Sequence, residues 1–510
     1  MIPTVCDFLA HYARFTPNKL AAVDVATARR WTYAELDRDV ERCTYVLESR
    51  AGKLRGERIA VLSRNSVDML IVHFACVRTG AIFVPLNWRL APPEIAFLLE
   101  DCTPRLLVAE EGLLHLVPDS FDAPRIVISE TRNELAEAIA AAPEPNRLGV
   151  VRADDPNRPI TILYSSGTTG RPKGAIVTEL NAVASSLNLA LGIKVTSESV
   201  FLCDPPLFHT SGLLAAARTP LFMGATVLIN QKFDAQKSYD LLTDPVLGVT
   251  HYFAVPQMAM SMRQLPGFDG TRLAKLTALV TGGAPNPEAH ILRWLDDGVM
   301  MANGWGMSET GSSLQQPVGD LDRIRANPAS AGYPLLTTEI RIVDENGNDV
   351  PDGTVGEIWI RGMNVTPGYW QRPELNAKAF QDGWFKTGDA AFRDSEGRYT
   401  LVDRIKDMYI SGGENVYPAE VEAAITELRQ VAEVAVVGVP DERWGEVGCA
   451  FIVPAQGVEL TESGLIEFCY SRLARYKVPK HVVFTDAIPR TASGKVQKHI
   501  LREMWLSRRT

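Results

Sequence analysis

The chain has 510 residues, more than one hydrophobic core usually organises, so we expect two or more domains. Apolar residues make up 46% and charged residues 22%, which is the ordinary composition of a globular protein. The formal net charge of −9 leaves no basic excess that could neutralise nucleic-acid phosphates. This balance excludes a general nucleic-acid binder.

Seven cysteines lie scattered along the chain, and none forms a Cys-x-x-Cys pair. This spacing argues against a disulfide framework or a zinc site and favours a reducing compartment. The first residues lack the basic and apolar segments of a signal peptide. The most apolar stretch, residues 69–86, is interrupted by His73, Arg78 and Gly80, so we expect no membrane span and a soluble, cytoplasmic protein.

Strands and helices alternate in the first part of the chain. Residues 1–50 predict two helices flanking a short strand pair, with Thr32 and Glu35 forming a capping box at the second helix. Further apolar runs predict strands at residues 58–62, 81–85 and 105–109 and helices at residues 66–78 and 92–99. Such alternation is typical of an α/β layer with a largely parallel sheet.

The pattern changes further along the chain. After a proline- and charge-rich connector at residues 142–159, a second α/β run extends from Asn181 to about Asn303. Its predicted strands include residues 225–229, 249–253 and 278–281. From about Ile340, short strands between Asp, Gly and Asn turns predict a β-rich subdomain, and beyond Asp403 follows an α+β unit large enough for a domain. We therefore predict an α/β protein whose large N-terminal domain has two α/β sheets and a β-rich subdomain, with a small α+β C-terminal domain.

A loop rich in glycine and hydroxyl residues, residues 164–174, reads Tyr-Ser-Ser-Gly-Thr-Thr-Gly-Arg-Pro-Lys-Gly and directly follows a β-prone run. Its glycines let backbone N–H groups turn toward an anion, its hydroxyls add donors, and Lys173 adds a mobile positive charge. The loop is not a Walker A motif, because only two residues separate Gly167 from Gly170 and Gly174 follows the lysine. The composition predicts a phosphate-binding loop, and an ordinary surface turn is the alternative.

Five further stretches follow in order. They are residues 304–310 (Gly-Trp-Gly-Met-Ser-Glu-Thr), 387–389 (Thr-Gly-Asp), 403–407 (Asp-Arg-Ile-Lys-Asp), 411–415 (Ser-Gly-Gly-Glu-Asn) and 489–495 (Pro-Arg-Thr-Ala-Ser-Gly-Lys). With the loop, their order and spacing resemble the adenylate-forming superfamily of acyl-CoA synthetases, peptide-synthetase adenylation domains and luciferases. The resemblance covers essentially the whole chain.

The resemblance implies an enzyme that joins a carboxylate to ATP, releases pyrophosphate and passes the acyl-adenylate to a thiol. Asp389 would accept hydrogen bonds from the ribose with help from Arg404, and Trp305, where the family usually has tyrosine, would stack on adenine. The full set of implied ATP-binding residues is Ser165, Ser166, Gly167, Thr168, Thr169, Gly170, Lys173, Gly283, Ala284, Pro285, Gly304, Trp305, Gly306, Met307, Ser308, Asp389, Arg404 and Lys495.

The resemblance assigns the implied chemistry to three side chains. Glu309 would bind Mg²⁺ together with a loop hydroxyl, Ser165 or Thr168. Lys495 would neutralise the charge that develops between the α-phosphate and the attacking carboxylate. His209 resembles the aromatic or histidine gate beside the carboxylate, with an ordinary neutral loop histidine as the alternative.

The resemblance also implies that the small domain rotates between two half-reactions. The hinge would be Lys406 within residues 403–407, between an N-terminal domain of residues 1–402 and a mobile C-terminal domain of residues 408–510. Rotation would withdraw Lys495 and bring CoA-binding residues to the site. These would be Ser411, Gly412, Gly413, Glu414, Trp444, Arg475 and Lys477.

The implied acyl pocket has no lysine or arginine in its sequence stretches, which disfavours a dicarboxylate such as malonate or oxalate. Its small residues leave room for an aryl, cinnamyl-type or medium- to long-chain alkyl group. The pocket residues are His209, Thr210, Gly212, Val255, Met258, Gly282 and Gly304. Elsewhere, Glu179 replaces the histidine of a Thr-His-x-Asn pattern common in relatives, and we expect this to alter packing rather than chemistry.

The leading hypothesis is an ATP-dependent acyl-CoA synthetase that uses Mg²⁺ and CoA and acts on an apolar carboxylic acid. The alternatives are a stand-alone adenylation enzyme that loads a separate carrier protein, a luciferase-like oxygenase and a non-catalytic nucleotide-binding relative. A homodimer also stays open.

Overall fold

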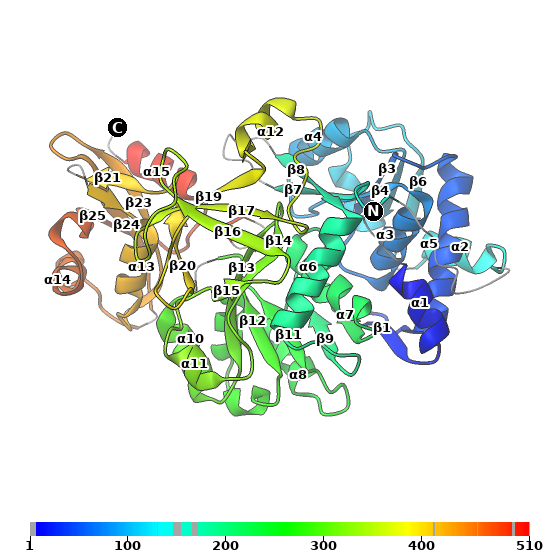
Figure 1. Ribbon diagram of the computed structural model, residues 1–510, viewed down its shortest axis with the longest axis horizontal. Coiled ribbons are helices and arrows are strands. Elements are labelled where there is room, and N and C mark those ends of the chain that lie inside the picture. Colours follow the sequence, from blue (N-terminus) through cyan, green and yellow to red (C-terminus); the bar gives the residue numbers. More distant parts are fainter. Residues whose placement is uncertain are drawn as a thin grey trace.

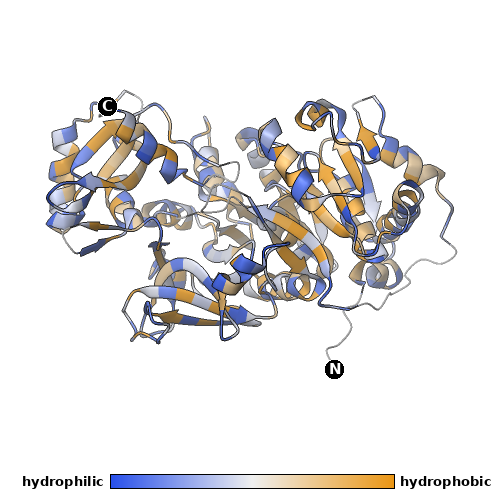
Figure 2. Cartoon of the chain, turned by 90° about the horizontal axis from the view of Figure 1, so that it is seen from above, coloured by the Kyte–Doolittle hydropathy of each residue, from blue (hydrophilic) through white to orange (hydrophobic). Residues whose placement is uncertain are grey.

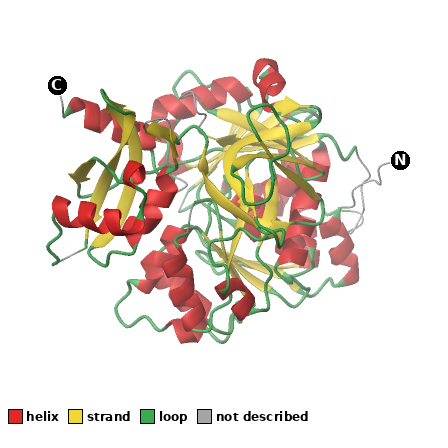
Figure 3. Ribbon diagram, turned by 60° about the vertical axis from the view of Figure 1, so that its left-hand side comes forward, coloured by secondary structure: helices red, strands yellow, loops and turns green. Residues whose placement is uncertain are grey.

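The computed structural model describes residues 7–129, 131–145, 155–165, 172–284, 286–411, 414–455, 457–491 and 495–508. The predicted fold class is confirmed: two large sheets and a smaller one form the N-terminal part, and an α+β unit lies at one end of the molecule (Figures 1 and 3). None of the described helices has both the length and the apolar character that a membrane crossing requires.

The first large sheet has the strand order β6-β5-β3-β4-β7-β8. Five strands run parallel and the last pairs antiparallel; they are β3 (Arg58–Leu62), β4 (Ile82–Pro85), β5 (Leu106–Glu110), β6 (Arg125–Ile128), β7 (Pro159–Ser165) and β8 (Lys173–Thr178). The predicted strands agree within one residue. The helices are α1 (Phe8–Phe15), α2 (Tyr33–Ala51), α3 (Val67–Thr79), α4 (Pro92–Cys102) and α5 (Glu134–Ala141), with a 3₁₀ turn η1 (Glu111–Leu116).

Local capping chemistry sets two of these boundaries, the first of which was predicted. Thr32 and Glu35 form the capping box at the start of α2, and Ser66 accepts a hydrogen bond from the Met69 N–H at the start of α3. Helix α4 runs to Cys102, three residues beyond its predicted end at 99, because Leu98, Leu99 and Cys102 continue its buried face.

The second large sheet has nine strands in the order β15-β14-β13-β12-β11-β9-β10-β1-β2. Their bounds are β1 (Leu20–Asp24), β2 (Arg30–Thr32), β9 (Val200–Cys203), β10 (Thr226–Ile229), β11 (His251–Ala254), β12 (Ala278–Thr281), β13 (Met301–Met307), β14 (Gly311–Gln315) and β15 (Tyr333–Pro334). β1 pairs parallel with β10, about two hundred residues away in the chain, so the N-terminal hairpin belongs to this sheet. The sequence predicted the hairpin but not its partner.

The helices and turns of this layer all come from the middle of the chain. They are α6 (Glu179–Gly192), a π-helix η2 (Ser211–Arg218), α7 (Thr219–Phe222), α8 (Ala235–Thr243), α9 (Pro256–Arg263), η3 (Gly270–Leu273), α10 (Glu288–Asp296) and α11 (Leu321–Arg325). The two large sheets share one hydrophobic core, which contains Ile59 and Phe83 of the first and Leu202, Val227 and Val280 of the second. Figure 2 shows the hydrophobic residues concentrated along the sheet strands.

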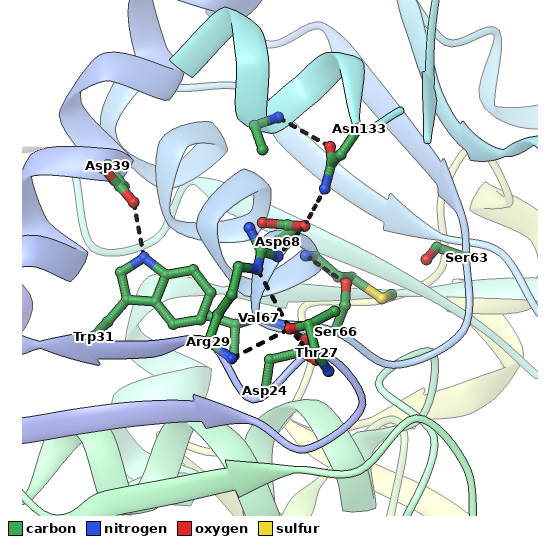
Figure 4. Close-up of polar contacts among 12 residues, drawn as sticks. Asp24, Thr27, Arg29, Trp31, Asp39, Ser63, Ser66, Val67, Asp68 and Asn133 are labelled. Carbon is green, nitrogen blue, oxygen red and sulfur yellow. Dashed lines mark hydrogen bonds and ion pairs between the residues drawn. The ribbon is translucent and has the colours of Figure 1, made fainter. Parts of the chain in front are cut away.

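A buried polar network fastens the N-terminal hairpin to the first α/β layer (Figure 4). Asp24 at the end of β1 accepts hydrogen bonds from the Val67 N–H at the start of α3 and from Thr27. Arg29 pairs with Asp68 at 2.5 Å, and Asn133 donates to the same carboxylate at 2.7 Å while its Oδ1 caps α5. The network therefore ties β1, α3 and α5 together at the junction of the two layers.

A second polar cluster explains the glutamate that replaces the histidine common in relatives. Glu179, at the start of α6, pairs with Arg218, at the end of the π-helix η2. Arg218 is only 1% exposed, and its guanidinium carbon lies 4.9 Å from the Phe8 ring centroid. Burial and Arg218 lower the pKa of His73, so the neutral imidazole can accept from Arg218 Nη1, 3.5 Å away. In this chain Glu179 therefore forms a buried ion pair between α6 and η2.

The remaining sheets are smaller. The β-rich subdomain has β16 (Thr338–Val343), β17 (Gly356–Gly362), β18 (Phe380–Gln381), β19 (Trp384–Arg393) and β20 (Tyr399–Arg404), with α12 (Pro373–Ala379). The C-terminal unit has β21 (Tyr409–Ser411), β22 (Glu414–Val416), β23 (Val431–Asp441), β24 (Gly445–Pro454), β25 (His481–Phe484), α13 (Pro418–Thr426), α14 (Glu462–Arg472), η4 (Arg475–Lys477) and α15 (Lys498–Ser507).

Candidate active site

The phosphate-binding loop predicted from the sequence is the tip of the β7–β8 hairpin. Ser165 is the last residue of β7 and faces Lys173, the first residue of β8, in the strand register. Between them, the predicted ATP-binding residues Ser166, Gly167, Thr168, Thr169 and Gly170 lie outside the described residues, and so do Pro285, Gly412 and Gly413.

Lys173 reaches from this hairpin to the glutamate predicted to bind metal. Its Nζ lies 3.2 Å from Glu309 Oε1 and donates to the Tyr369 hydroxyl at 2.6 Å. The same hydroxyl donates to Glu309 Oε1 at 2.8 Å. Glu309 is only 4% exposed, so its charge is compensated by neighbouring protein groups rather than by bulk water.

The residues predicted to hold the nucleoside lie together on two neighbouring sheets. Asp389 of β19 accepts a hydrogen bond from Trp305 Nε1 of β13 at 2.9 Å, and Arg404 Nε of β20 lies 3.1 Å from its other oxygen. Burial raises the pKa of Asp389, while the Arg404 charge and the Trp305 hydrogen bond oppose that rise. The indole that replaces the usual tyrosine therefore also orients the carboxylate predicted to bind ribose.

The charge of Lys495, from the C-terminal unit, acts on this group. Although the residue has solvent contact, the protein around its ammonium lowers the pKa of Lys495 by desolvation and by the charge of Arg404. The carboxylates of Asp389 and Glu309 act in the opposite direction. Glu309 and Lys495 were predicted for the chemistry and Asp389 for the ribose site. The three residues are therefore close enough for their charges to interact.

The acyl-pocket loop, residues 205–212, is held from two sides. Asn65 donates to the Pro205 carbonyl at 3.0 Å and accepts from the Leu207 N–H at 2.9 Å. Gly212 packs so closely on this loop that an added Cβ would lie 2.2 Å from the Pro206 oxygen. Burial, followed by the charges of Lys495 and Arg89, lowers the pKa of His209 to about 3, so this imidazole is neutral at physiological pH.

The other residues predicted to line the acyl pocket lie at or near the ends of β11, β12 and β13. A Cβ on Gly282 would lie 3.1 Å from the Gly304 oxygen and 3.5 Å from the Phe253 ring, which brings these three residues together. Gly283 has φ +83° and lies beside Val255. Met258 is buried on α9. The residues described along this part of the predicted pocket are glycines and apolar side chains.

Some buried polar atoms of predicted site residues have no hydrogen-bond partner within the described residues. They are Ser165 Oγ, His209 Nε2 and Thr210 Oγ1, whereas Asp389 Oδ1 forms the ion pair with Arg404. Buried polar groups normally find a partner, and those that do not are concentrated where a ligand supplies it. Ser165 was predicted to face the phosphates, and His209 and Thr210 to face the acyl group, so a ligand bound as predicted would supply the missing partners.

The comparisons agree with this geometry. The model for AMP-binding enzymes matches residues 9–370, and the model for the AMP-binding enzyme C-terminal domain matches residues 420–495. The chain belongs to the AMP-binding enzyme family. A feruloyl-CoA synthase from Amycolatopsis sp is 39% identical over 490 residues, or 96% of each chain. An indoleacetate–CoA ligase from Aromatoleum aromaticum is 37% identical over 509 residues, or 98% of this chain and 97% of the relative.

Solved structures of the AMP-binding enzyme family match over the whole chain. ATP-bound MatB from Rhodopseudomonas palustris, 31% identical, superimposes with a TM-score of 0.89 over 98% of this chain and 99% of that chain. Apo MatB from the same organism, also 31% identical, superimposes with 0.78 over 98% and 100%. The arrangement of this chain is thus closer to the ATP-bound form. By class, this AMP-binding enzyme is an AMP-forming acid–CoA ligase.

The predicted CoA-binding residues of this AMP-binding enzyme lie on the C-terminal unit. Ser411 pairs with Glu414 and with Gly445 in the strand register, which brings these residues beside Trp444, 44% exposed. Lys477, in the turn η4 with Arg475, is held by Glu420 at 2.6 Å. The described members of this predicted CoA-binding set lie on the same unit. The charge from the C-terminal unit that lowers the pKa of Asp389 is that of Lys495.

The sequence analysis missed functional candidates that lie outside the motifs. Tyr369 was missed because its partners, Lys173 and Glu309, come from two other segments. Arg89, whose guanidinium carbon lies 5.0 Å from the Trp88 ring centroid and 5.9 Å from that of Phe208, was missed because it belongs to none of the quoted pocket stretches. The remaining predicted ATP-site positions, Ala284, Gly306, Met307 and Ser308, flank the residues described above on β13 and after β12.

Proposed function

We propose that this AMP-binding enzyme adenylates an apolar carboxylic acid and transfers the acyl group to CoA, releasing AMP and pyrophosphate. The observation that carries the proposal is that the charge of Lys495 interacts with Glu309 and Asp389 and also with His209 of the acyl-pocket loop. A cation placed between a phosphate position and a carboxylate position can neutralise both anions as they approach. Residues 165–173 would hold the β- and γ-phosphates, and Asp389 with Arg404 would hold the ribose.

The donor set fits the magnesium ion that accompanies ATP. Within the described residues, Glu309 Oε2 has no hydrogen-bond or ion-pair partner, and Ser165 Oγ is also unpartnered. One carboxylate and one hydroxyl suit a hard cation that takes its other ligands from phosphate and water. Bound there, Mg²⁺ would neutralise phosphate charge during displacement. Thr168 stays a predicted ligand.

The pocket favours an aryl or cinnamyl-type acid over a dicarboxylate, with a medium- to long-chain fatty acid as the other apolar class. Its described walls contain Phe253, Val255, Met258 and glycines, and its histidine is uncharged. Aromatic acids are also named for two of the relatives, the feruloyl-CoA synthase and the indoleacetate–CoA ligase. A cytoplasmic location and a homodimer stay predictions from the sequence.

A panel of acids tests the proposed function. The purified protein is incubated with MgATP and ferulate, indoleacetate, palmitate or malonate, with and without CoA, and pyrophosphate and acyl-CoA are measured. We expect acyl-CoA from an aryl or long-chain acid and none from malonate. Acyl-AMP that accumulates without transfer to CoA would favour a stand-alone adenylation enzyme, and no pyrophosphate with any acid would favour a non-catalytic relative.

We also propose that the domains divide at residues 403–407 and rotate about Lys406. Asp403 is the first residue of this segment and precedes Lys406, on β20. Its Oδ2 accepts from the Ala419 N–H of α13 at 2.8 Å and lies 3.8 Å from Lys498 Nζ of α15. Both partners follow the hinge, so rotation must separate them from Asp403. The contacts therefore stabilise the arrangement in which Lys495 is at the site.

Asp403→Ala is expected to slow adenylation about tenfold, because a hydrogen bond to a charged group contributes roughly 1.5–3 kcal/mol to this arrangement. Thioester formation from supplied acyl-adenylate should be equal or faster. Single-turnover rates of both half-reactions check this, with the exposed Asp486→Ala as the matched control. Equal slowing of both steps would contradict the proposed rotation.

A further inference from the structure

Tyr369 lies between the two charged residues on which the proposed adenylation depends. It belongs to the segment between β17 and α12 and is only 4% exposed. Lys173 comes from β8 and Glu309 follows β13, so three separate parts of the chain meet at this hydroxyl.

The Tyr369 hydroxyl acts once as a hydrogen-bond donor and once as a hydrogen-bond acceptor. It donates its single proton to Glu309 Oε1 at 2.8 Å and accepts a hydrogen bond from Lys173 Nζ at 2.6 Å. The same ammonium lies 4.1 Å from the Tyr369 ring centroid. Both hydrogen bonds have a charged partner, so they are stronger and more directional than bonds between neutral groups.

The backbone around Tyr369 is tied to both of its partners. The Trp370 N–H donates to the Gly174 carbonyl at 2.8 Å, next to Lys173 on β8. The Thr366 N–H donates to the carbonyl of Glu309 itself at 2.7 Å. The Tyr369 N–H donates to Asn376 Oδ1 at 2.7 Å, which fixes the segment to α12. The hydroxyl is therefore held in place by its own main chain before any ligand binds.

We propose that Tyr369 is a positioning residue for the metal–nucleotide complex. Its hydroxyl donates a hydrogen bond to Oε1 of Glu309 and so orients Oε2 toward the metal of MgATP. Its ring keeps the Lys173 ammonium beside the phosphates. Within the described residues, Oε2 is the oxygen of Glu309 that accepts no hydrogen bond and forms no ion pair. The inference rests on the proposed function, because it concerns the same site.

The variant Tyr369→Phe tests this role, since it keeps the ring and removes only the hydroxyl. Mn²⁺ in place of Mg²⁺ is titrated into the enzyme with ATP, and free Mn²⁺ is followed by electron paramagnetic resonance. We expect Mn²⁺ affinity in the ATP complex to fall about tenfold or more, as for the loss of a hydrogen bond to a charged group. Binding of metal-free ATP should change less than threefold.

Tyr399→Phe is the matched control, because Tyr399 is also 4% exposed and its hydroxyl lies 3.4 Å from the Ile340 carbonyl in the β-rich subdomain. It should leave Mn²⁺ affinity unchanged. Thermal unfolding of both variants shows whether each is folded, and retained binding of metal-free ATP gives a second check for Tyr369→Phe.

Two results would overturn the inference. One is a Tyr369→Phe protein that binds Mn²⁺ with ATP as tightly as the parent does. The other is an equal loss of Mn²⁺-dependent adenylation and of metal-independent thioester formation from supplied acyl-adenylate, which indicates a general structural defect. A parent protein that binds no Mn²⁺–ATP would instead refute the proposed function, so the two failures are distinguishable.

Discussion

Replacing Lys495 with alanine is expected to reduce the rate of adenylation about 10²- to 10³-fold, the range for loss of one preorganised charge-stabilising group. The reason is that the charge of the Lys495 ammonium interacts with Glu309, Asp389 and the acyl-pocket histidine, where negative charge would develop. Thioester formation from supplied acyl-adenylate should stay within about threefold, since the phosphate bond is already broken. Single-turnover measurement of each half-reaction, with the acid that the panel selects, gives both rates.

The exposed Lys275→Ala serves as the control for this prediction, because it removes a lysine outside the site. It should leave both rates unchanged. A Lys495→Ala protein that lost both half-reactions to the same degree would contradict the division of labour between the two arrangements of the C-terminal domain.

The largest effect on stability is expected from Glu179→Ala, which leaves Arg218 without its partner. Arg218 is 1% exposed, and truncating one member of a buried ion pair typically costs about 3–5 kcal/mol. The free energy of unfolding, measured by urea denaturation at pH 7, should fall by that amount.

Two further variants test the cause. The double variant Glu179→Ala with Arg218→Met should recover at least half of the loss, because no uncompensated charge remains buried. Glu339→Ala breaks the exposed pair with Arg361, so it should change stability by less than about 1 kcal/mol. A loss of only that size for Glu179→Ala would show that the buried pair contributes little.

The local elements of the fold were predictable because their signals lie within a few neighbouring residues. The Thr32–Glu35 capping box appeared where the side-chain chemistry predicted it, and the helix predicted from residue 66 starts after a Ser66 cap. The buried strands β3 and β12 occupy the predicted residues, and β11 begins two residues later than predicted. Short-range periodicity and capping determine these boundaries almost independently of the rest of the chain.

The pairing partners of these elements could not be predicted from the sequence in the same way. Pairing of β1 with β10 joins segments about two hundred residues apart, and nothing in the sequence of either strand specifies the other as its partner. The same holds for Tyr369, which becomes a candidate only when Lys173 and Glu309 are seen to share its hydroxyl. Contacts of this kind depend on the packing of whole layers, which local patterns do not encode.

By itself, the sequence determined the fold class, the order of the motifs and the resemblance to adenylate-forming enzymes, because glycine, hydroxyl and charged residues at set spacings carry that information locally. Only the tertiary structure decided that the indole of Trp305 donates to Asp389, that Glu179 pairs with Arg218 and that the charge of Lys495 interacts with that of Glu309. These interactions join side chains far apart in the chain, because the packing of whole layers around a shared core brings distant segments together.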